Sequence, residues 1–141
     1  MKTNFRRITT SALVVAAAAL GACATPTTTQ TVTLTGDAEV PGFATAGNGN
    51  ATITVLPDGT VYGSMIAYNF TPTMGHIHMA APGANGPVIV PMTQSGNVLT
   101  VPAGTKLTPE QLAAYKAGNT YVNIHSVAHP GGEVRAQLKG L

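Results

Sequence analysis

Residues 51–62 read ATITVLPDGTVY, and this stretch decides the fold class of the chain. Ala51, Ile53 and Val55 alternate with threonines, and an apolar residue at every second position is the pattern of a half-buried β-strand. The letters PDGT within the stretch are residues that favour a tight turn. A second strand-like run then continues to Phe70. The stretch therefore predicts an antiparallel hairpin.

Similar short runs, bounded by glycine, proline or asparagine, occur on both sides of this hairpin. The expected strands lie near residues 32–34, 76–79, 87–92, 97–101, 121–126 and 133–138. Many short strands separated by turns are typical of all-β folds in which a sheet packs on another sheet or closes on itself. The sequence predicts a mainly β fold, an antiparallel β-sandwich or a Greek-key barrel.

One short helix is expected near residues 108–117. Thr108 stands in the N-cap position, Pro109 in the first helical position and Gln111 three residues after the cap, which is the pattern of a capping box. Gly118 is placed to end the helix. We interpret this helix as a structural connector.

The N-terminal residues have the pattern of an export signal. Lys2, Arg6 and Arg7 are followed by an alanine-rich apolar run that extends from Ile8 to Leu20. This run is too short for a transmembrane helix, and it ends in small residues, as secretory signals do.

The end of that run, LGAC at residues 20–23, resembles the lipobox of bacterial lipoproteins. In that family the cysteine is acylated and the signal is cut before it. The resemblance implies a signal peptide over residues 1–22, a lipidated Cys23 with a flexible tether over 23–30, and a folded domain over 31–141. It also implies that the membrane is a partner, through the lipid.

Export determines the expected compartment and the charge. Cys23 is the only cysteine, so the exported domain has no disulfide. Without Lys2, Arg6 and Arg7 the chain keeps four basic against five acidic residues, a net charge of −1. Because there is no basic patch, nucleic-acid binding is excluded. Ala24 follows the cysteine, where an aspartate retains some lipoproteins in the inner membrane, so we expect a lipid anchor in the cell envelope with the outer membrane favoured.

All four histidines lie in two short clusters: His76 with His78, and His125 with His129. Residues two apart on a strand point to the same face, so His76 and His78 present two imidazoles side by side. Neutral imidazole is a common ligand of copper, zinc and nickel. The clusters predict a metal site made by these four histidines, although hydrogen bonds to backbone groups at a sheet end are the alternative role.

The strand that contains His125 has two distinct faces. Tyr121, Asn123 and His125 share one face, and Val122 and Ile124 share the other, which we expect to face the core. His125 therefore points away from the main apolar set, toward a site beside the other histidine pair.

Two further groups of residues bear on this site. Glu133 and Arg135 lie two apart on a strand, which predicts a structural ion pair, with each other or with a neighbouring strand. The alternative is a carboxylate that orients a metal-binding histidine. The methionines are expected to fill the core. However, Met74 and Met79 flank the His76 and His78 pair, and a thioether close to a metal ion favours Cu(I).

Five segments together resemble the CHRD domain, a module named after the developmental protein chordin and common in exported bacterial proteins. The segments are GDAEVP at 36–41, GHIH at 75–78, GANGPV at 83–88, GNTYVNIHS at 118–126 and HPGGEVRAQL at 129–138. The chain departs from the family pattern at Gly42, where a second proline is usual, and at Ala136, where glycine is usual. The arrangement of histidines and glycine-rich turns is also distantly similar to copper/zinc superoxide dismutase.

These observations lead to three hypotheses about function. The first is a cell-envelope lipoprotein whose CHRD domain binds a transition metal, copper ahead of zinc, for buffering or delivery. The second is a structural or protein-interaction module that needs no metal. The third is a superoxide dismutase-like copper enzyme, which the lack of a disulfide and of an aspartate cluster disfavours, so we lean against catalysis.

Overall fold

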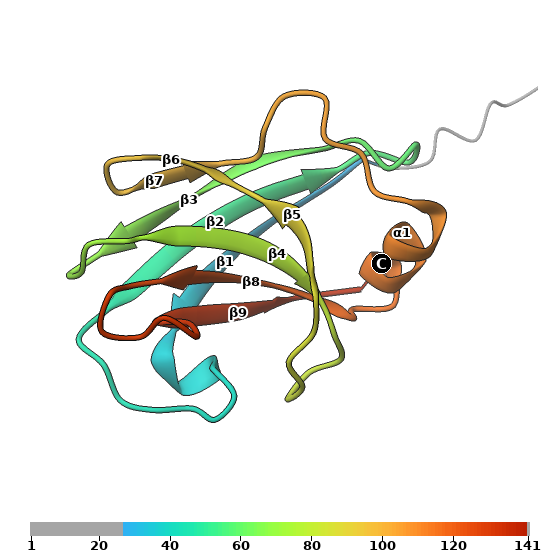
Figure 1. The fold of residues 1–141 in the computed structure, drawn as a ribbon. Coiled ribbons are helices and arrows are strands. Elements are labelled where there is room, and N and C mark those ends of the chain that lie inside the picture. Colours follow the sequence, from blue (N-terminus) through green and yellow to red (C-terminus); the bar gives the residue numbers. More distant parts are fainter. Residues whose placement is uncertain (1–26, 141) are drawn as a thin grey trace, which may run out of the picture.

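A computed structural model describes residues 27–140 of the chain (Figure 1). Its elements in chain order are β1 (Thr28–Thr35), the 3-10 turn η1 (Gly36–Ala38), β2 (Asn48–Val55), β3 (Val61–Tyr68), β4 (Met74–Met79), β5 (Val88–Pro91), β6 (Thr93–Ser95), β7 (Val98–Thr100), α1 (Pro109–Lys116), β8 (Thr120–His125) and β9 (Val134–Leu138). The predicted mainly β fold with one short helix is confirmed.

The hairpin that the sequence predicts is formed by β2 and β3. The two strands pair antiparallel along their whole length, from Asn48 opposite Tyr68 to Val55 opposite Val61. The turn between them is closed by a hydrogen bond from the Leu56 N–H to the Thr60 carbonyl, at 2.8 Å.

All nine strands belong to one antiparallel sheet that nearly closes into a barrel. The order of strands is β5-β4-β8-β9-β1-β2-β3-β7-β6, so β8 and β9 lie between β4 and β1. The two outermost strands, β5 and β6, are separated in sequence only by Met92, whose N–H donates to the Gly75 carbonyl at 3.0 Å. Figure 1 shows these two strands following one another along the seam. The structure therefore favours the barrel among the two predicted architectures.

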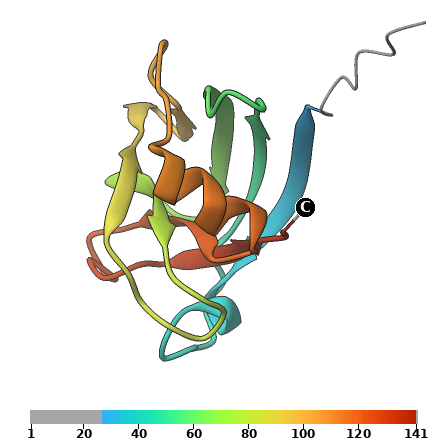
Figure 2. The same cartoon turned by 90° about the vertical axis from the view of Figure 1, so that its right-hand side faces the viewer.

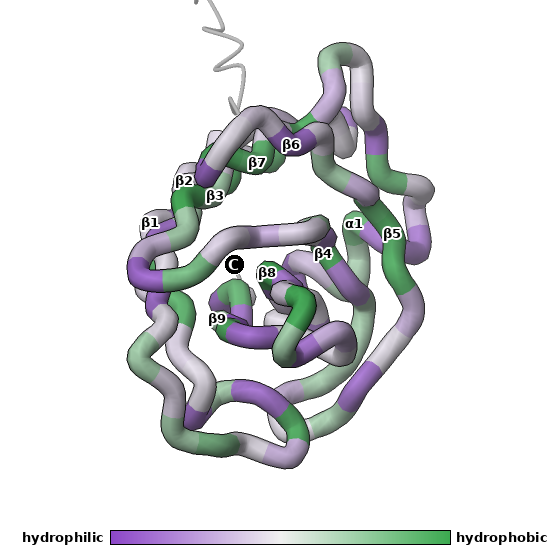
Figure 3. The backbone as a smooth tube through the Cα atoms, turned by 60° about the vertical axis from the view of Figure 1, so that its left-hand side comes forward, coloured by the Kyte–Doolittle hydropathy of each residue, from purple (hydrophilic) through white to green (hydrophobic). Residues whose placement is uncertain are grey.

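The core fills the inside of this barrel. Hydrophobic residues alternate with hydrophilic ones along the strands (Figure 3), and the apolar members point inward. The most deeply buried core residues include Leu34, Ile53, Met65, Leu99 and Ile124.

Helix α1 lies across one end of the barrel (Figure 2). Its predicted capping box is present, with the Thr108 hydroxyl accepting from the Gln111 N–H and the Gln111 side chain accepting from the Thr108 N–H. Gly118, at φ +76°, follows the helix in the left-handed conformation that glycine favours. Tyr115 is buried in the core, so the helix covers that end of the barrel.

Two details of the fold differ from the sequence expectations. Strand β1 begins at Thr28 and pairs with β2 from that residue on, so it includes residues 28–30 of the expected tether. Strand β6, which pairs with β7, was not expected. It consists of three exposed polar residues, which give no apolar pattern.

The expected signal peptide, Cys23 and the tether up to residue 26 lie outside the described residues. Between residues 27 and 140, no helix is long and apolar enough to span a membrane.

Candidate metal centre

The pairing of β4 with β8 brings histidines from distant parts of the sequence together. In this register, Met74 lies opposite His125, His76 opposite Asn123 and His78 opposite Tyr121. Residues directly opposite one another in an antiparallel pair share a face of the sheet. All six side chains therefore lie on the outer face of the barrel, because Val122 and Ile124 occupy the inner face, as predicted.

Three imidazoles converge on this outer face. His76, His78 and His125 each offer a ring nitrogen, and these three nitrogens lie within 4.8 Å of one another. The Nδ1 of His76 is 3.1 Å from the Nε2 of His125. We call His76, His78 and His125 the histidine triad.

Backbone carbonyls determine which nitrogen carries the proton in two of the rings. The Nδ1 of His78 lies 2.9 Å from the Gly86 carbonyl oxygen, and the Nδ1 of His125 lies 2.9 Å from the Pro130 carbonyl oxygen. A carbonyl can only accept, so each Nδ1 is protonated and donates. The Nε2 of each neutral ring then keeps its lone pair, which is the form that a metal ion binds.

One of these lone pairs has no partner in the protein. The Nε2 of His78 is buried and makes no hydrogen bond to any residue that the structure describes. Buried polar atoms in proteins are nearly always paired, so an unpaired one calls for an explanation. A metal ion held by the triad would use this nitrogen.

The surroundings keep the triad uncharged. Burial, together with the smaller effects of the neighbouring His125 and His78, lowers the pKa of His76 to about 4. Burial also lowers the pKa values of His78 and His125, against the hydrogen bonds to Gly86 and Pro130 that raise them. At neutral pH the three rings are therefore unprotonated at one nitrogen each and can hold a metal ion.

A family model for the CHRD domain matches residues 30–138. The chain belongs to the CHRD domain family. No curated protein and no solved structure matches the chain.

The loop between β4 and β5 of this CHRD domain contacts the triad at His78, and Figure 1 shows this loop below the sheet. Arg135 holds this loop by donating to the Ala84 carbonyl at 2.9 Å and to the Asn85 side chain at 3.2 Å. The residue after Asn85 is Gly86, whose carbonyl accepts from His78. The position of a triad nitrogen therefore depends on a buried arginine two strands away.

Glu133 and Arg135 do not pair with each other in the described part of the chain. Glu133 is buried and accepts from the hydroxyls of Ser126, at 2.7 Å, and Thr45. Arg135 lies over the ring of Tyr121 with its Cζ 3.5 Å from the ring centroid. The two therefore form no ion pair with each other, because the Glu133 carboxylate accepts from Ser126 and Thr45 while the Arg135 guanidinium donates to the β4–β5 loop.

His129 lies apart from the triad. Its ring stacks on Phe43, with 4.3 Å between the centroids, and its Nε2 is 3.7 Å from Glu133. It lines a hollow of about 340 Å³ together with Glu39 and Asn85. Glu133 thus contacts a histidine, as the alternative hypothesis expected, but this histidine is not one of the triad.

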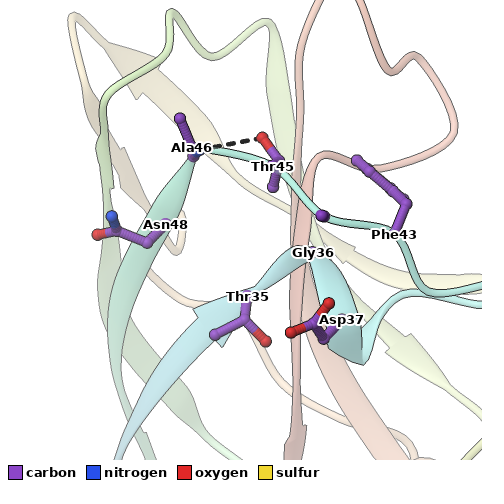
Figure 4. A pocket seen from close by; sticks show the side chains of 9 residues that line it. Thr35, Gly36, Asp37, Phe43, Thr45, Ala46 and Asn48 are labelled. Carbon is purple, nitrogen blue, oxygen red and sulfur yellow. Dashed lines mark hydrogen bonds between the residues drawn. The ribbon is translucent and has the colours of Figure 1, made fainter.

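A second hollow, of about 290 Å³, lies where β1 leads into η1 and where the following loop returns to β2 (Figure 4). Asp37, Thr45 and Asn48 are among its lining residues, and the Thr45 hydroxyl accepts from the Gly47 N–H at 3.0 Å. Asp37 is the one acidic side chain in this lining, and the triad does not contribute to it.

Sequence reasoning missed the residues that orient the triad. The carbonyls of Gly86 and Pro130 accept from His78 and His125. The available signal was the glycine-rich character of the loops that follow β4 and β8.

Proposed function

We propose that this CHRD domain binds one transition-metal ion, copper ahead of zinc, through His76, His78 and His125. The observation that supports this best is the convergence of three neutral imidazoles, one of which carries a buried nitrogen without a hydrogen-bond partner. His129, which sequence reasoning included, is left out of the ligand set because its ring packs on Phe43.

The donor atoms favour a transition metal over calcium or magnesium. Ca²⁺ and Mg²⁺ prefer oxygen ligands, whereas imidazole suits copper and zinc. Among the divalent first-row ions, Cu²⁺ binds nitrogen ligands most tightly. For this reason we place copper before zinc.

The role we propose is buffering or delivery of the ion at the cell envelope. Three histidine ligands leave a fourth position for a ligand that can be exchanged. His76 is only partly buried, so a donor or acceptor can approach the ion from its side of the triad. Such an exchange needs no catalytic group.

The place of the protein in the envelope rests on the lipobox-like residues 20–23. We propose that Cys23 carries the lipid and that residues 1–22 are removed. Mass spectrometry of the protein from membranes tests this directly. A peptide that begins at an acylated Cys23 is expected, and a peptide that retains residues 1–22 would contradict it.

The metal hypothesis is tested by calorimetric titration of the full chain with Cu(II) and Zn(II). All samples carry Cys23→Ser, so that the only thiol of the chain does not bind copper. His76→Ala and His125→Ala remove triad ligands, and His129→Ala is the matched control, because it removes a histidine outside the triad. Circular dichroism of each variant checks that it is folded.

We expect one ion per chain, binding lost in the two triad variants, and binding retained in His129→Ala. Binding weaker than about 10 μM in the parent, which is about −7 kcal/mol, would end the metal hypothesis. Equal losses in His129→Ala and His76→Ala would place the site elsewhere.

A further inference from the structure

Met74 occupies a position beside the triad that the ligand set above does not use. It is the first residue of β4, and His76 and His78 follow at the second and fourth positions after it, so the three side chains share a face. Across the strand pair, Met74 lies directly opposite His125. It is therefore a neighbour of two triad members at once.

The packing of the fold does not account for a methionine at this position. Met65 is fully buried in the core, and Met92 packs against the core. Met74, in contrast, is 46% exposed, on a face where its neighbours are polar. The expectation that it fills the core is wrong for this residue.

A methionine at this position can reach the triad. Directly opposite residues in an antiparallel pair have their Cβ atoms about 4.5–5.5 Å apart. The methionine side chain has three rotatable bonds and a polarisable sulfur. Since Met74 is exposed, it can turn toward His125 without displacing core atoms.

We infer that Met74 supplies a thioether as a fourth ligand to the ion held by the histidine triad, and that the site thereby holds Cu(I) as well as Cu(II). This rests on the proposed metal-binding function. Thioether sulfur is a soft donor that selects Cu(I), whereas the imidazoles serve both oxidation states. Zinc gains less from such a ligand, so Met74 also favours copper over zinc.

The test compares Met74→Leu with Met79→Leu in the full chain that carries Cys23→Ser. Met79 is the matched control, because it is on the same strand but on the opposite face and opposite Thr120. Cu(I) affinity is measured without oxygen by competition with a chromogenic Cu(I) chelator, and Cu(II) affinity is measured by calorimetry. Thermal unfolding shows whether each variant keeps the stability of the parent.

We expect Met74→Leu to weaken Cu(I) binding by about tenfold or more, a change of about 1.4 kcal/mol, and to change Cu(II) binding far less. Met79→Leu should leave both unchanged. X-ray absorption of the Cu(I) form should show sulfur scattering in the parent and in Met79→Leu, and none in Met74→Leu.

The outcomes separate this inference from the function on which it rests. If Met74→Leu binds Cu(I) as tightly as the parent while His76→Ala loses Cu(II), the triad binds copper without Met74 and the inference is wrong. If the parent binds neither ion, both the inference and the proposed function are wrong.

Discussion

The ring of His78 lies face to face with the ring of Tyr121, with 4.7 Å between the centroids and 6° between the planes. Arg135, from the strand on the other side of β8, lies against the same tyrosine ring. The hydroxyl of Tyr121 also accepts from the Gly86 N–H at 3.3 Å. One aromatic residue thus contacts a triad ligand, the loop that orients it and the arginine that holds the loop.

We predict that Tyr121→Leu weakens metal binding by about tenfold or more, because residues that orient ligands usually contribute that much. Tyr121→Phe keeps the stacked ring and loses only the hydroxyl, so its loss should be smaller. Calorimetric titration with Cu(II) measures both. Equal losses in the two variants would show that the hydroxyl, and not the stacking, positions His78.

Arg135→Met should destabilise the fold by about 2 kcal/mol. The Ala84 carbonyl and the Asn85 side chain in the β4–β5 loop lose their hydrogen-bond donor, whereas an apolar side chain still fills the buried position. Arg135 is 1% exposed, and its guanidinium also donates to Gln137 at 3.2 Å. Urea unfolding measures the change. Lys106→Met is the control, since the pair between Lys106 and Asp58 is exposed and its loss should have no measurable effect.

Two adjacent glycines in the β8–β9 loop should respond differently to alanine. Gly132 has φ +141°, and a Cβ there would overlap the carboxylate of Glu39. A Cβ at Gly131 would have no atom within 4 Å apart from those of its chain neighbours. Gly132→Ala should lower the free energy of unfolding by about 1–3 kcal/mol, and Gly131→Ala should not lower it.

The same variants also test the triad. Pro130, whose carbonyl accepts from His125, precedes these two glycines. Calorimetry should therefore show weaker copper binding in Gly132→Ala and unchanged binding in Gly131→Ala. Stability that falls equally in both would contradict the role of the Gly132 backbone conformation.

Glu39→Gln should change how stability depends on pH. Burial raises the pKa of Glu39 to about 7, with Arg135 acting against this shift and Glu133 adding to it. The folded protein therefore keeps Glu39 protonated up to about pH 7, while the unfolded chain ionises above its usual pKa of 4.5. The wild type should lose stability through this group as the pH rises from 4.5 to 7, and lose no more above that.

Glutamine does not ionise, so the stability of the variant relative to the wild type should rise between pH 4.5 and 7. Above pH 7 the difference in stability should stay constant. Urea unfolding at several pH values between 4.5 and 8 measures the difference in unfolding free energy. A difference that stays constant with pH would show that Glu39 ionises at the same pH in both states.

The parts of the fold that local sequence determines were predicted well. The β2–β3 hairpin depends on its turn residues and on the alternation beside them, and the capping of α1 depends on residues three positions apart. Both features are present. Strand β6 could not be predicted because its residues 93–95 are polar and exposed; its pairing with β7 defines it.

The candidate site could be predicted only in part. The period of a strand places His76 and His78 on one face, but the register that adds His125 joins strands more than forty residues apart. This reasoning does not extend to His129, because the chain leaves β8 after His125 and alternation does not apply in the loop. The covering loops also escaped prediction, since backbone carbonyls carry no side-chain signal.

The pairing of β1 also shows where along the barrel the triad lies. Thr35, at the end of β1, lies opposite Arg135 of β9. Arg135 lies opposite Asn123 of β8, and Asn123 lies opposite His76 of β4. The start of β1 lies seven residues back, about 23 Å along the strand. The triad therefore lies near the level of Thr35, at the other end of β1 from Thr28. If Cys23 carries the lipid proposed above, the triad would lie at the end of the barrel away from the start of β1.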